Sequence, residues 1–196
     1  MKASYILVCS PMRTGSTYVY NFFNECVSGV TVKKYEHSPM NFLVGTDFAP
    51  IIFRHPVACI GSLIEYFNET YNLDSITKHY NFIKPQYEWA KQLLVEFPNC
   101  AVELRYENFF NNIDFLVDWT RINLEYEIHS NILEKFTTKF NLNNIKIMSD
   151  NNLNLFQPNH ISSGKGNNKE KIEKVFRTKL LYRELSKFFR DYGYEY

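Results

Sequence analysis

A short polar segment near the amino terminus has the composition of an anion-binding loop. The letters "RTGST" bring together Arg13, Gly15 and the hydroxyls of Thr14, Ser16 and Thr17, just after the apolar run "YILVC". A glycine lets the backbone approach a ligand closely, and N–H groups at a helix start favour a negative charge. The ATP-binding pattern G-x-x-x-x-G-K-[ST] is not met, because its first glycine and its lysine are missing. The segment therefore predicts a compact anion site, or else an ordinary hydroxyl-capped helix start.

A second segment, "FRHPVACIGS", has an arginine and a serine at a spacing that could close on a phosphate. Arg54 follows the apolar run "PIIF", Pro56 suits the first turn of a helix, and Ser62 comes eight residues after Arg54. Eight residues span about two helical turns. The two side chains can therefore meet on one phosphate if the helix folds back over the end of the preceding strand. The alternative is a surface ion pair for Arg54 and a solvent-facing Ser62.

The elements that must position these segments alternate between strands and helices. Short apolar or β-branched runs predict strands at 5–9, 30–35, 51–53 and 101–104. Apolar spacing predicts helices at 16–27, 57–71, 75–97 (with a break or a new start at Pro85), 109–120, within 125–140 and within 172–192, and asparagine-rich residues 141–159 predict a long loop. This order predicts a three-layer α/β fold like that of P-loop NTPases, with a parallel sheet of about four to five strands flanked by helices. Ligands of such sheets bind beyond the carboxyl ends of the strands, where both polar segments fall.

Length and composition limit the classes of protein. The 196 residues predict a single domain covering 1–196, and a hydrophobic content of 45% is enough for a full core. A net charge of +1 argues against nucleic-acid binding through bulk electrostatics. No apolar run approaches the ~20 residues of a membrane span, and we expect no signal peptide. Four widely spaced cysteines predict reduced thiols and a cytoplasmic protein, and no metal-ligand spacing is found.

The segment "PMRTGSTY" resembles the 5′-phosphosulfate loop of sulfotransferases that use 3′-phosphoadenosine 5′-phosphosulfate (PAPS). That loop typically reads Pro-Lys/Arg-Ser-Gly-Thr/Ser-Thr-Trp/Leu, and Met12 is a departure because it separates the proline from the basic residue. The resemblance implies that Tyr18 lies near the adenine. It implies that the 5′-phosphosulfate is bound by Arg13, Thr14, Gly15, Ser16 and Thr17.

The second segment is similar to the 3′-phosphate element of the same family, which reads Arg-Asp/Asn-Pro with a serine eight residues after the arginine. Arg54, Pro56 and Ser62 match this element, and His55 replaces the acidic or amide residue. Since ATP has no 3′-phosphate, a second phosphate site of this kind favours a 3′-phosphorylated nucleotide over ATP.

Two later segments resemble elements of the family less completely. "RYEN" is similar to the family's Tyr-Glu-Asp-Leu segment near the adenine, with Tyr106 and Glu107 matching and Asn108 in place of the aspartate. Glu107 and Asn108 could equally cap a helix. "ISSGKG" resembles the family's late Arg-Lys-Gly loop, which implies a 3′-phosphate contact by Gly164 and Lys165. Serines replace the basic pair there, and a solvated loop is the alternative.

Sulfuryl transfer to a hydroxyl or amine acceptor needs charge stabilisation and a base. Arg13 is the expected stabiliser of the charge that builds on the leaving phosphate. His37 is one candidate base, because it titrates near neutrality and lies in a His-x-Pro setting similar to that of the catalytic histidine of cytosolic family members. Glu36 is the other, since some bacterial members use a carboxylate at a comparable distance after the loop. Neighbours on an extended chain point to opposite sides, so we expect one of the two to face the site.

The resemblance implies a PAPS-dependent sulfotransferase that makes 3′,5′-ADP and a sulfated small molecule or carbohydrate, without a metal. The alternatives are an ATP-dependent phosphotransferase with a P-loop, and a nucleotide-binding protein of the same fold without catalysis. Aromatic residues between 42 and 89 could line an acceptor pocket or form the core.

Overall fold

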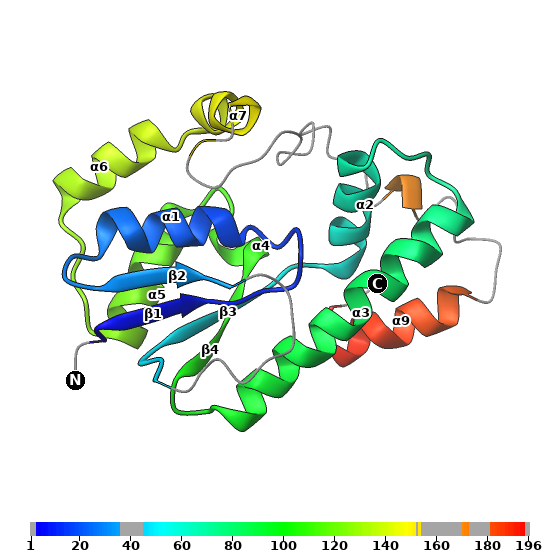
Figure 1. The fold of residues 1–196 in the computed structure, drawn as a ribbon, viewed down its shortest axis with the longest axis horizontal. Coiled ribbons are helices and arrows are strands. Elements are labelled where there is room, and N and C mark those ends of the chain that lie inside the picture. The colour runs from blue at the N-terminus through cyan, green and yellow to red at the C-terminus, as the bar shows by residue number, and fades with distance from the viewer. Residues whose placement is uncertain (1–2, 36–44, 152, 154–169, 173–180, 195–196) are drawn as a thin grey trace.

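Four parallel strands form the centre of the computed structural model (Figure 1). They are β1 (Tyr5–Val8), β2 (Thr31–Lys34), β3 (Ala49–Phe53) and β4 (Ala101–Arg105). The structure describes residues 3–35, 45–151, 153, 170–172 and 181–194. All of β3 and most of β1 are buried, as expected for strands that are covered on both faces.

The strands form one parallel arrangement in which β1 and β3 lie at the centre. β1 pairs with β2, and β3 pairs with β4. Backbone hydrogen bonds also join β1 to β3, from Leu7 N to the Phe48 carbonyl at 3.0 Å and from Ile52 N to the Cys9 carbonyl at 2.9 Å. The order across the described strands is therefore β2-β1-β3-β4. The prediction of a mixed α/β fold with parallel strands is confirmed, with four strands in the described part of the chain.

Helices join β1 to β2 and β3 to β4, and further helices follow β4. α1 (Ser16–Cys26) joins β1 to β2, and α2 (Pro56–Tyr66) and α3 (Leu73–Glu96) lie between β3 and β4. The described helices after β4 are α4 (Tyr106–Phe109), α5 (Ile113–Leu124), α6 (Ser130–Lys139), α7 (Leu142–Asp150) and α9 (Leu181–Asp191). None of the described helices combines the length and the apolar character that crossing a bilayer would require.

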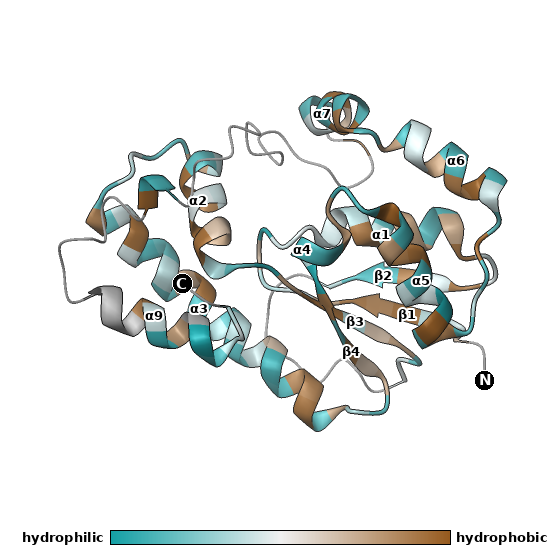
Figure 2. Cartoon of the chain, turned by 180° about the vertical axis from the view of Figure 1, so that it is seen from behind, coloured by the Kyte–Doolittle hydropathy of each residue, from teal (hydrophilic) through white to brown (hydrophobic). Residues whose placement is uncertain are grey.

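The two faces of the sheet carry separate hydrophobic clusters, so the fold has three layers. Ile6 and Val8 point to the face that is covered by α1, α5 and α6. Leu7 and Cys9, which alternate with them along the chain, point to the face that is covered by α2, α3 and α9. Figure 2 shows β1 and β3 as largely apolar strands between these helices. Because helices cover both faces, we expect a ligand to bind beyond the carboxyl ends of the strands.

α3 continues through Pro85, where the sequence predicted a break or a new start. A proline inside a helix removes one backbone hydrogen bond and costs about 3 kcal/mol. The helix nevertheless buries one face along most of its length, including Ile76, Ile83 and Leu93. Burial of each such side chain contributes about 1.5–3 kcal/mol, so the buried face outweighs the proline.

Two segments after β4 also differ from the prediction. The helix predicted at 109–120 is two helices, because Asn111 has a φ of 61° and Asn112 caps α5 by accepting a hydrogen bond from the N–H group three residues later. The loop predicted at 141–159 contains α7, which Asn141 caps in the same way. In both segments an asparagine caps the start of a helix, although the asparagine-rich composition of 141–159 predicts a loop.

Three strands end beside a helix start at the same edge of the sheet. β1 leads into the loop before α1, β3 leads into α2, and β4 leads directly into α4. Phe53 and Arg105 are partners in the parallel register, so Arg54 and Tyr106 leave the sheet as neighbours. Both polar segments singled out in the sequence lie at this edge.

Candidate functional site

The loop between β1 and α1 is held in an uncommon backbone conformation by contacts on both sides. Arg13 has a φ of 67°, a left-handed conformation that residues other than glycine seldom adopt. The Thr14 hydroxyl donates to the Pro11 carbonyl at 2.9 Å, and the Met12 N–H donates to Gln86 Oε1 on α3 at 2.8 Å. These hydrogen bonds fix the path of the loop. Strained backbone that is fixed by its surroundings is a feature of ligand-binding loops.

Gly15 is required both by its own backbone and by a neighbouring ring. Its φ is 86°, and a Cβ placed on it would lie 2.7 Å from Tyr106 Cδ2, which is closer than carbon atoms pack. The Gly15 carbonyl accepts a hydrogen bond from Tyr18 N at 3.0 Å, so α1 begins directly after the glycine. The absence of a side chain therefore allows α4 to lie against the start of α1.

The start of α1 contacts a lysine that the sequence analysis missed. Ser16 and Thr17 are buried, and Lys34 at the end of β2 donates from Nζ to Thr17 Oγ1 at 2.9 Å. The adjacent Lys33 is exposed and lies over the Tyr5 ring instead. The doubled lysine at the end of a predicted strand was a usable signal, because neighbours on a strand face opposite sides. Lys34 places an ammonium group beside a helix start that already favours an anion.

The Arg13 side chain reaches across to α2. Its Nε donates to Ser62 Oγ at 2.9 Å, and its Cζ lies 5.0 Å from the centre of the Tyr66 ring. Ser62 is buried, so it does not face solvent. Burial, and then the nearby charge of Arg54, lower the pKa of Arg13 to about 10. The charged form of Arg13 is thus held where a bound anion would stabilise it.

Arg54, at the end of β3, approaches Arg13 from another element. Its Nη1 donates to the Arg13 carbonyl at 3.0 Å, and its Cζ lies 4.2 Å from the centre of the Tyr106 ring. Among the residues that the structure describes, no carboxylate forms an ion pair with Arg54. We call Arg13, Arg54 and Ser62 together the arginine cluster. Two predicted phosphate-binding segments that are distant in the sequence therefore meet at one place.

The arginine cluster has the chemistry of a phosphate site. Two like charges held close together repel each other unless an anion joins them. Guanidinium groups bind phosphate oxygens through pairs of parallel hydrogen bonds. With Lys34, the site gathers positive groups from the ends of three neighbouring strands. It is suited to a ligand that carries more than one phosphate or sulfate group.

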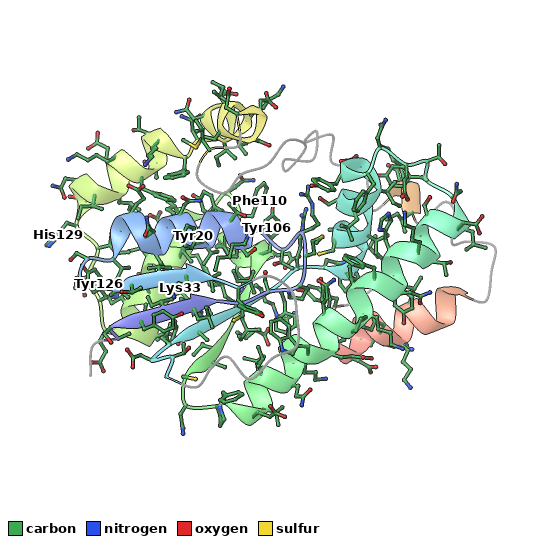
Figure 3. The ribbon with its side chains drawn as sticks, in the orientation of Figure 1. Tyr20, Lys33, Tyr106, Phe110, Tyr126 and His129 are labelled. Atoms are coloured by element: carbon green, nitrogen blue, oxygen red, sulfur yellow. The ribbon has the colours of Figure 1, made fainter. Side chains whose placement is uncertain are left out.

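Glu107 reaches from α4 to the neighbouring strand end. Its Oε1 accepts a hydrogen bond from His55 N at 2.7 Å, and its Oε2 accepts one from the Tyr194 hydroxyl at 3.4 Å. Tyr106, beside it, stacks on Phe110 with 4.6 Å between ring centres. Figure 3 shows these two rings together near the start of α1. α4 therefore supplies both an aromatic surface and a carboxylate to this edge of the sheet.

Tyr18 is held by aromatic neighbours. Its ring stacks with Phe109 at 6.4 Å between centres and meets Phe136 of α6 edge-on at 5.4 Å. Burial raises the pKa of Tyr18 from 10.0 to about 12. The ring is half-buried, and its contact with an adenine stays a prediction.

Some of the predicted site residues lie outside the described residues. They are the two candidate bases, Glu36 and His37, and the late-loop residues Gly164 and Lys165. Their roles stay predictions. In the described part of the chain, no group of three or more His, Cys, Asp or Glu side chains is placed to hold a metal ion.

Comparison with known proteins gives a likeness in structure. No family model matches the chain, and no curated protein matches it in sequence. The crystal structure of mouse sulfotransferase SULT7A1 complexed with PAP superposes on it with a TM-score of 0.60 at 10% sequence identity. The match covers 96% of this chain and 89% of that one. The likeness shows that the chain has a sulfotransferase-like fold.

Proposed function

We propose that the protein is a PAPS-dependent sulfotransferase, which moves a sulfuryl group from PAPS to a hydroxyl or amine acceptor. The observation that carries this proposal is the arginine cluster, in which Arg13 donates to Ser62 and Arg54 donates to the Arg13 carbonyl. A nucleotide with phosphate groups at both the 5′ and the 3′ position presents two anions. The site offers one set of donors at the start of α1 with Lys34, and a second set in Arg54 and Ser62. The sulfotransferase-like fold supports the same proposal.

We assign the 5′-phosphosulfate to the start of α1. The N–H groups of a helix start, the hydroxyls of Ser16 and Thr17 and the ammonium of Lys34 lie there. When the bond between sulfur and the bridging oxygen breaks, negative charge builds on the 5′-phosphate. Arg13 and Lys34 would stabilise that charge.

We assign the 3′-phosphate to Arg54 and Ser62, with Gly164 and Lys165 as further proposed contacts. In the structure Ser62 accepts its hydrogen bond from Arg13. A bound 3′-phosphate would replace this hydrogen bond with bonds from both Ser62 and Arg54. The Tyr106 ring, against which the Arg54 guanidinium lies, would keep that guanidinium in place.

The proposed reaction is an in-line displacement at sulfur. The acceptor oxygen or nitrogen forms a bond to sulfur, the bond from sulfur to the 5′-phosphate breaks, and 3′,5′-ADP leaves. The acceptor proton goes to His37 or to Glu36, the two candidate bases. Positioning and charge stabilisation carry most of the catalysis in such transfers, which suits a site built from cations and backbone N–H groups. We propose a small molecule or a carbohydrate as the acceptor.

The test is calorimetric titration of the protein with 3′,5′-ADP, 5′-AMP and ATP–Mg²⁺. The variants are Arg54→Ala and, as a matched control, Arg121→Ala. Arg121 is an exposed arginine of α5 that pairs with Asp118. We expect 3′,5′-ADP to bind at least about tenfold more tightly than 5′-AMP, because a charge-assisted phosphate contact contributes about 1.5–3 kcal/mol. Arg54→Ala should remove most of this preference, and Arg121→Ala should leave it unchanged.

Two outcomes would contradict the proposal. Binding of ATP–Mg²⁺ that equals or exceeds that of 3′,5′-ADP and does not depend on Arg54 would favour the phosphotransferase. Binding of 3′,5′-ADP as expected, with no transfer of sulfate from PAPS to any acceptor in a broad panel, would favour the non-catalytic protein of the same fold.

A further inference from the structure

The peptide unit that links Arg54 to His55 is held at both of its polar atoms. The Tyr87 hydroxyl of α3 donates to the Arg54 carbonyl, and the His55 N–H donates to Glu107 Oε1 of α4 at 2.7 Å. A peptide unit is planar, so fixing its carbonyl and its N–H fixes the orientation of the whole plane. That plane sets one of the two backbone torsions of Arg54, and hence the direction in which its side chain leaves the strand.

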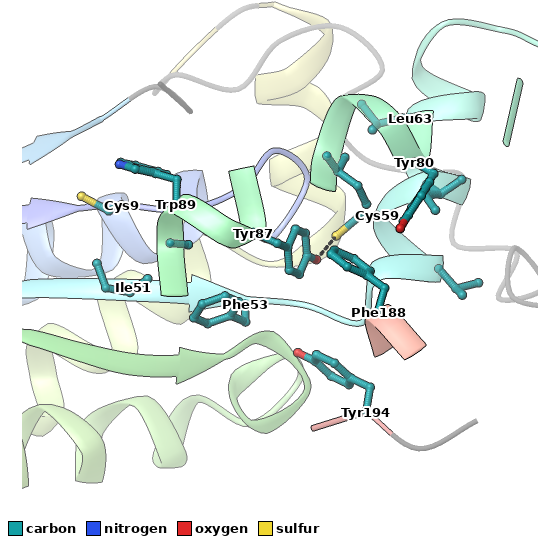
Figure 4. Close-up of a cluster of buried hydrophobic side chains, with 14 of the residues drawn as sticks. Cys9, Ile51, Phe53, Cys59, Leu63, Tyr80, Tyr87, Trp89, Phe188 and Tyr194 are labelled. Carbon is teal, nitrogen blue, oxygen red and sulfur yellow. Dashed lines mark hydrogen bonds between the residues drawn. The ribbon is translucent and has the colours of Figure 1, made fainter. Parts of the chain in front are cut away.

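Glu107 is itself held by the end of the chain. Its second oxygen accepts a hydrogen bond from the Tyr194 hydroxyl at 3.4 Å, and the Tyr194 ring lies 5.0 Å from the His55 ring. Tyr194 is buried. Figure 4 shows Tyr87 and Tyr194 on either side of the chain where β3 ends. Side chains from three separate elements therefore enclose the residue after Arg54.

The segment that carries Tyr194 is fixed by Arg105, the last residue of β4. The Arg105 guanidinium donates to the Gly193 carbonyl at 3.3 Å and to the Tyr192 carbonyl at 3.2 Å. It also lies against the Tyr194 ring, with 4.9 Å from Cζ to the ring centre. Gly193 has a φ of 70°, and a Cβ on it would lie 3.1 Å from Arg105 Nη2. The glycine thus allows the segment to turn closely over the arginine.

We infer that Glu107 and Tyr194 are positioning residues for Arg54, and that the segment 192–194 forms an outer layer of the nucleotide site. Glu107 orients the Arg54–His55 peptide, and Tyr194 orients Glu107. Neither residue needs to touch the ligand. This inference rests on the proposed function, because it assigns these residues to the same 3′-phosphate contact.

The inference predicts a selective defect. If Arg54 alone is misdirected, the contribution of the 3′-phosphate to binding falls, whereas the contribution of the 5′-phosphate stays. The ratio of the dissociation constants of 5′-AMP and 3′,5′-ADP measures the 3′ contribution alone. A general loss of stability would change both constants and leave the ratio as it was.

The experiment titrates 3′,5′-ADP and 5′-AMP into the wild type and into Glu107→Ala, Glu107→Gln and Tyr194→Phe. Glu107→Ala should lower the ratio about tenfold, because it leaves the His55 N–H without its acceptor. Glu107→Gln keeps an oxygen for the His55 N–H and should restore most of the ratio. Tyr194→Phe keeps the ring and removes the hydroxyl, so it should lower the ratio about threefold. The melting temperature of each variant is measured alongside.

The matched control is Tyr126→Phe. The Tyr126 hydroxyl also joins distant segments, through Ser28 N at 2.8 Å and Ser28 Oγ at 2.6 Å. Figure 3 shows Tyr126 well away from Tyr106. This variant loses a comparable hydroxyl and should leave the ratio unchanged. If Glu107→Ala does not fold, the inference is still tested by comparing the ratio for Tyr194→Phe with the ratio for Tyr126→Phe.

The experiment distinguishes failure of the proposed function from failure of this inference alone. A wild type without a preference for 3′,5′-ADP that depends on Arg54 would overturn the proposed function and this inference with it. If the preference is present but survives both Glu107→Ala and Tyr194→Phe, the inference alone is wrong. The same holds if these variants weaken both ligands by one common factor.

Discussion

The two halves of the proposed nucleotide site are built in different ways. The 5′ half comes mainly from one segment, since the Thr14 hydroxyl donates to the Pro11 carbonyl and α1 begins directly after Gly15, and β2 adds Lys34. The 3′ half is assembled from distant segments, because the peptide after Arg54 is held by Tyr87 on α3 and Glu107 on α4. The 5′ loop depends mainly on its own backbone conformation, with added contacts to Gln86 and Tyr106, whereas the 3′ half depends on packing between distant segments.

This difference has a consequence for mutation. A local loop in a strained conformation fails as a whole when one residue can no longer adopt its torsion angles. An assembled site has several supports, so losing one of them weakens a single contact. We therefore expect large, general effects from changes in the 5′ half and smaller, ligand-specific effects from changes in the 3′ half.

Gly15→Ala should have the largest effect. The new methyl group would lie 2.7 Å from Tyr106 Cδ2. The alanine backbone would also have to adopt a φ of 86°. We expect a loss of about 2–4 kcal/mol in the free energy of unfolding and weaker binding of every nucleotide. Urea denaturation measures the first effect, and calorimetry measures the second.

Gly29→Ala is the control for backbone strain alone. Gly29 has a φ of 75°, but nothing lies within 4 Å of a Cβ built on it. We expect a loss of about 1 kcal/mol without an effect on nucleotide binding. Equal losses for the two variants would show that the contact with Tyr106 does not matter.

Lys34→Met should have the next largest effect. Lys34 donates to Thr17 at the start of α1, so the change should weaken 3′,5′-ADP and 5′-AMP alike, each by about tenfold. Lys33→Met, on the exposed neighbour, should change either constant less than about twofold. If only the binding of 3′,5′-ADP is weakened, Lys34 belongs to the 3′ half, and the proposed division of the site is wrong.

Cys59 lies between the two halves and gives a smaller effect that depends on pH. Its Sγ lies 3.7 Å from the Arg13 carbonyl and 3.1 Å from the Tyr87 hydroxyl, and Figure 4 shows the latter contact. Burial raises the pKa of the Cys59 thiol from 9.0 to about 11. The folded protein therefore keeps a proton that the unfolded chain loses above pH 9, and stability falls as the pH rises from about 9 to about 11.

The measurement is the free energy of unfolding in urea between pH 8 and pH 11. One such thiol contributes a fall of up to about 1.4 kcal/mol per pH unit within this window. Cys59→Ala should reduce the slope by this amount, while other buried groups, among them Cys9 and Cys26 with pKa values raised to about 12, still contribute to the slope of the variant. If the stability of the wild type and of Cys59→Ala depends on pH in the same way, burial does not raise the pKa of Cys59.

In both halves of the proposed site, the sequence points to the residues at strand ends and misses a contact that comes from farther along the chain. The alternation of strands and helices places Arg13 and Arg54 at one edge, because parallel strands share their carboxyl end. Lys34 was missed, although the doubled lysine at a strand end was a signal for it. Tyr194 carried no such signal, because its contact with Glu107 spans 87 residues.

The helices predicted from the sequence also differ from the structure where packing outweighs local preference. Pro85 predicts a break or a new start, whereas α3 continues through this residue because one of its faces is buried. The asparagine-rich residues after Phe140 predict a loop, although Asn141 caps α7 and Ile145 of that helix is buried. Burial and packing are properties of the assembled fold, so a single sequence expresses them only weakly.

The division of the site into two halves is tested most directly by a crystal structure of the complex with 3′,5′-ADP. We expect the 5′-phosphate at the start of α1, beside Thr17 and Lys34, and the 3′-phosphate within hydrogen-bond distance of Arg54 and Ser62. The hydrogen bond from Arg13 to Ser62 should be open in that complex. A nucleotide bound in the reverse direction, or away from the arginine cluster, would contradict the account.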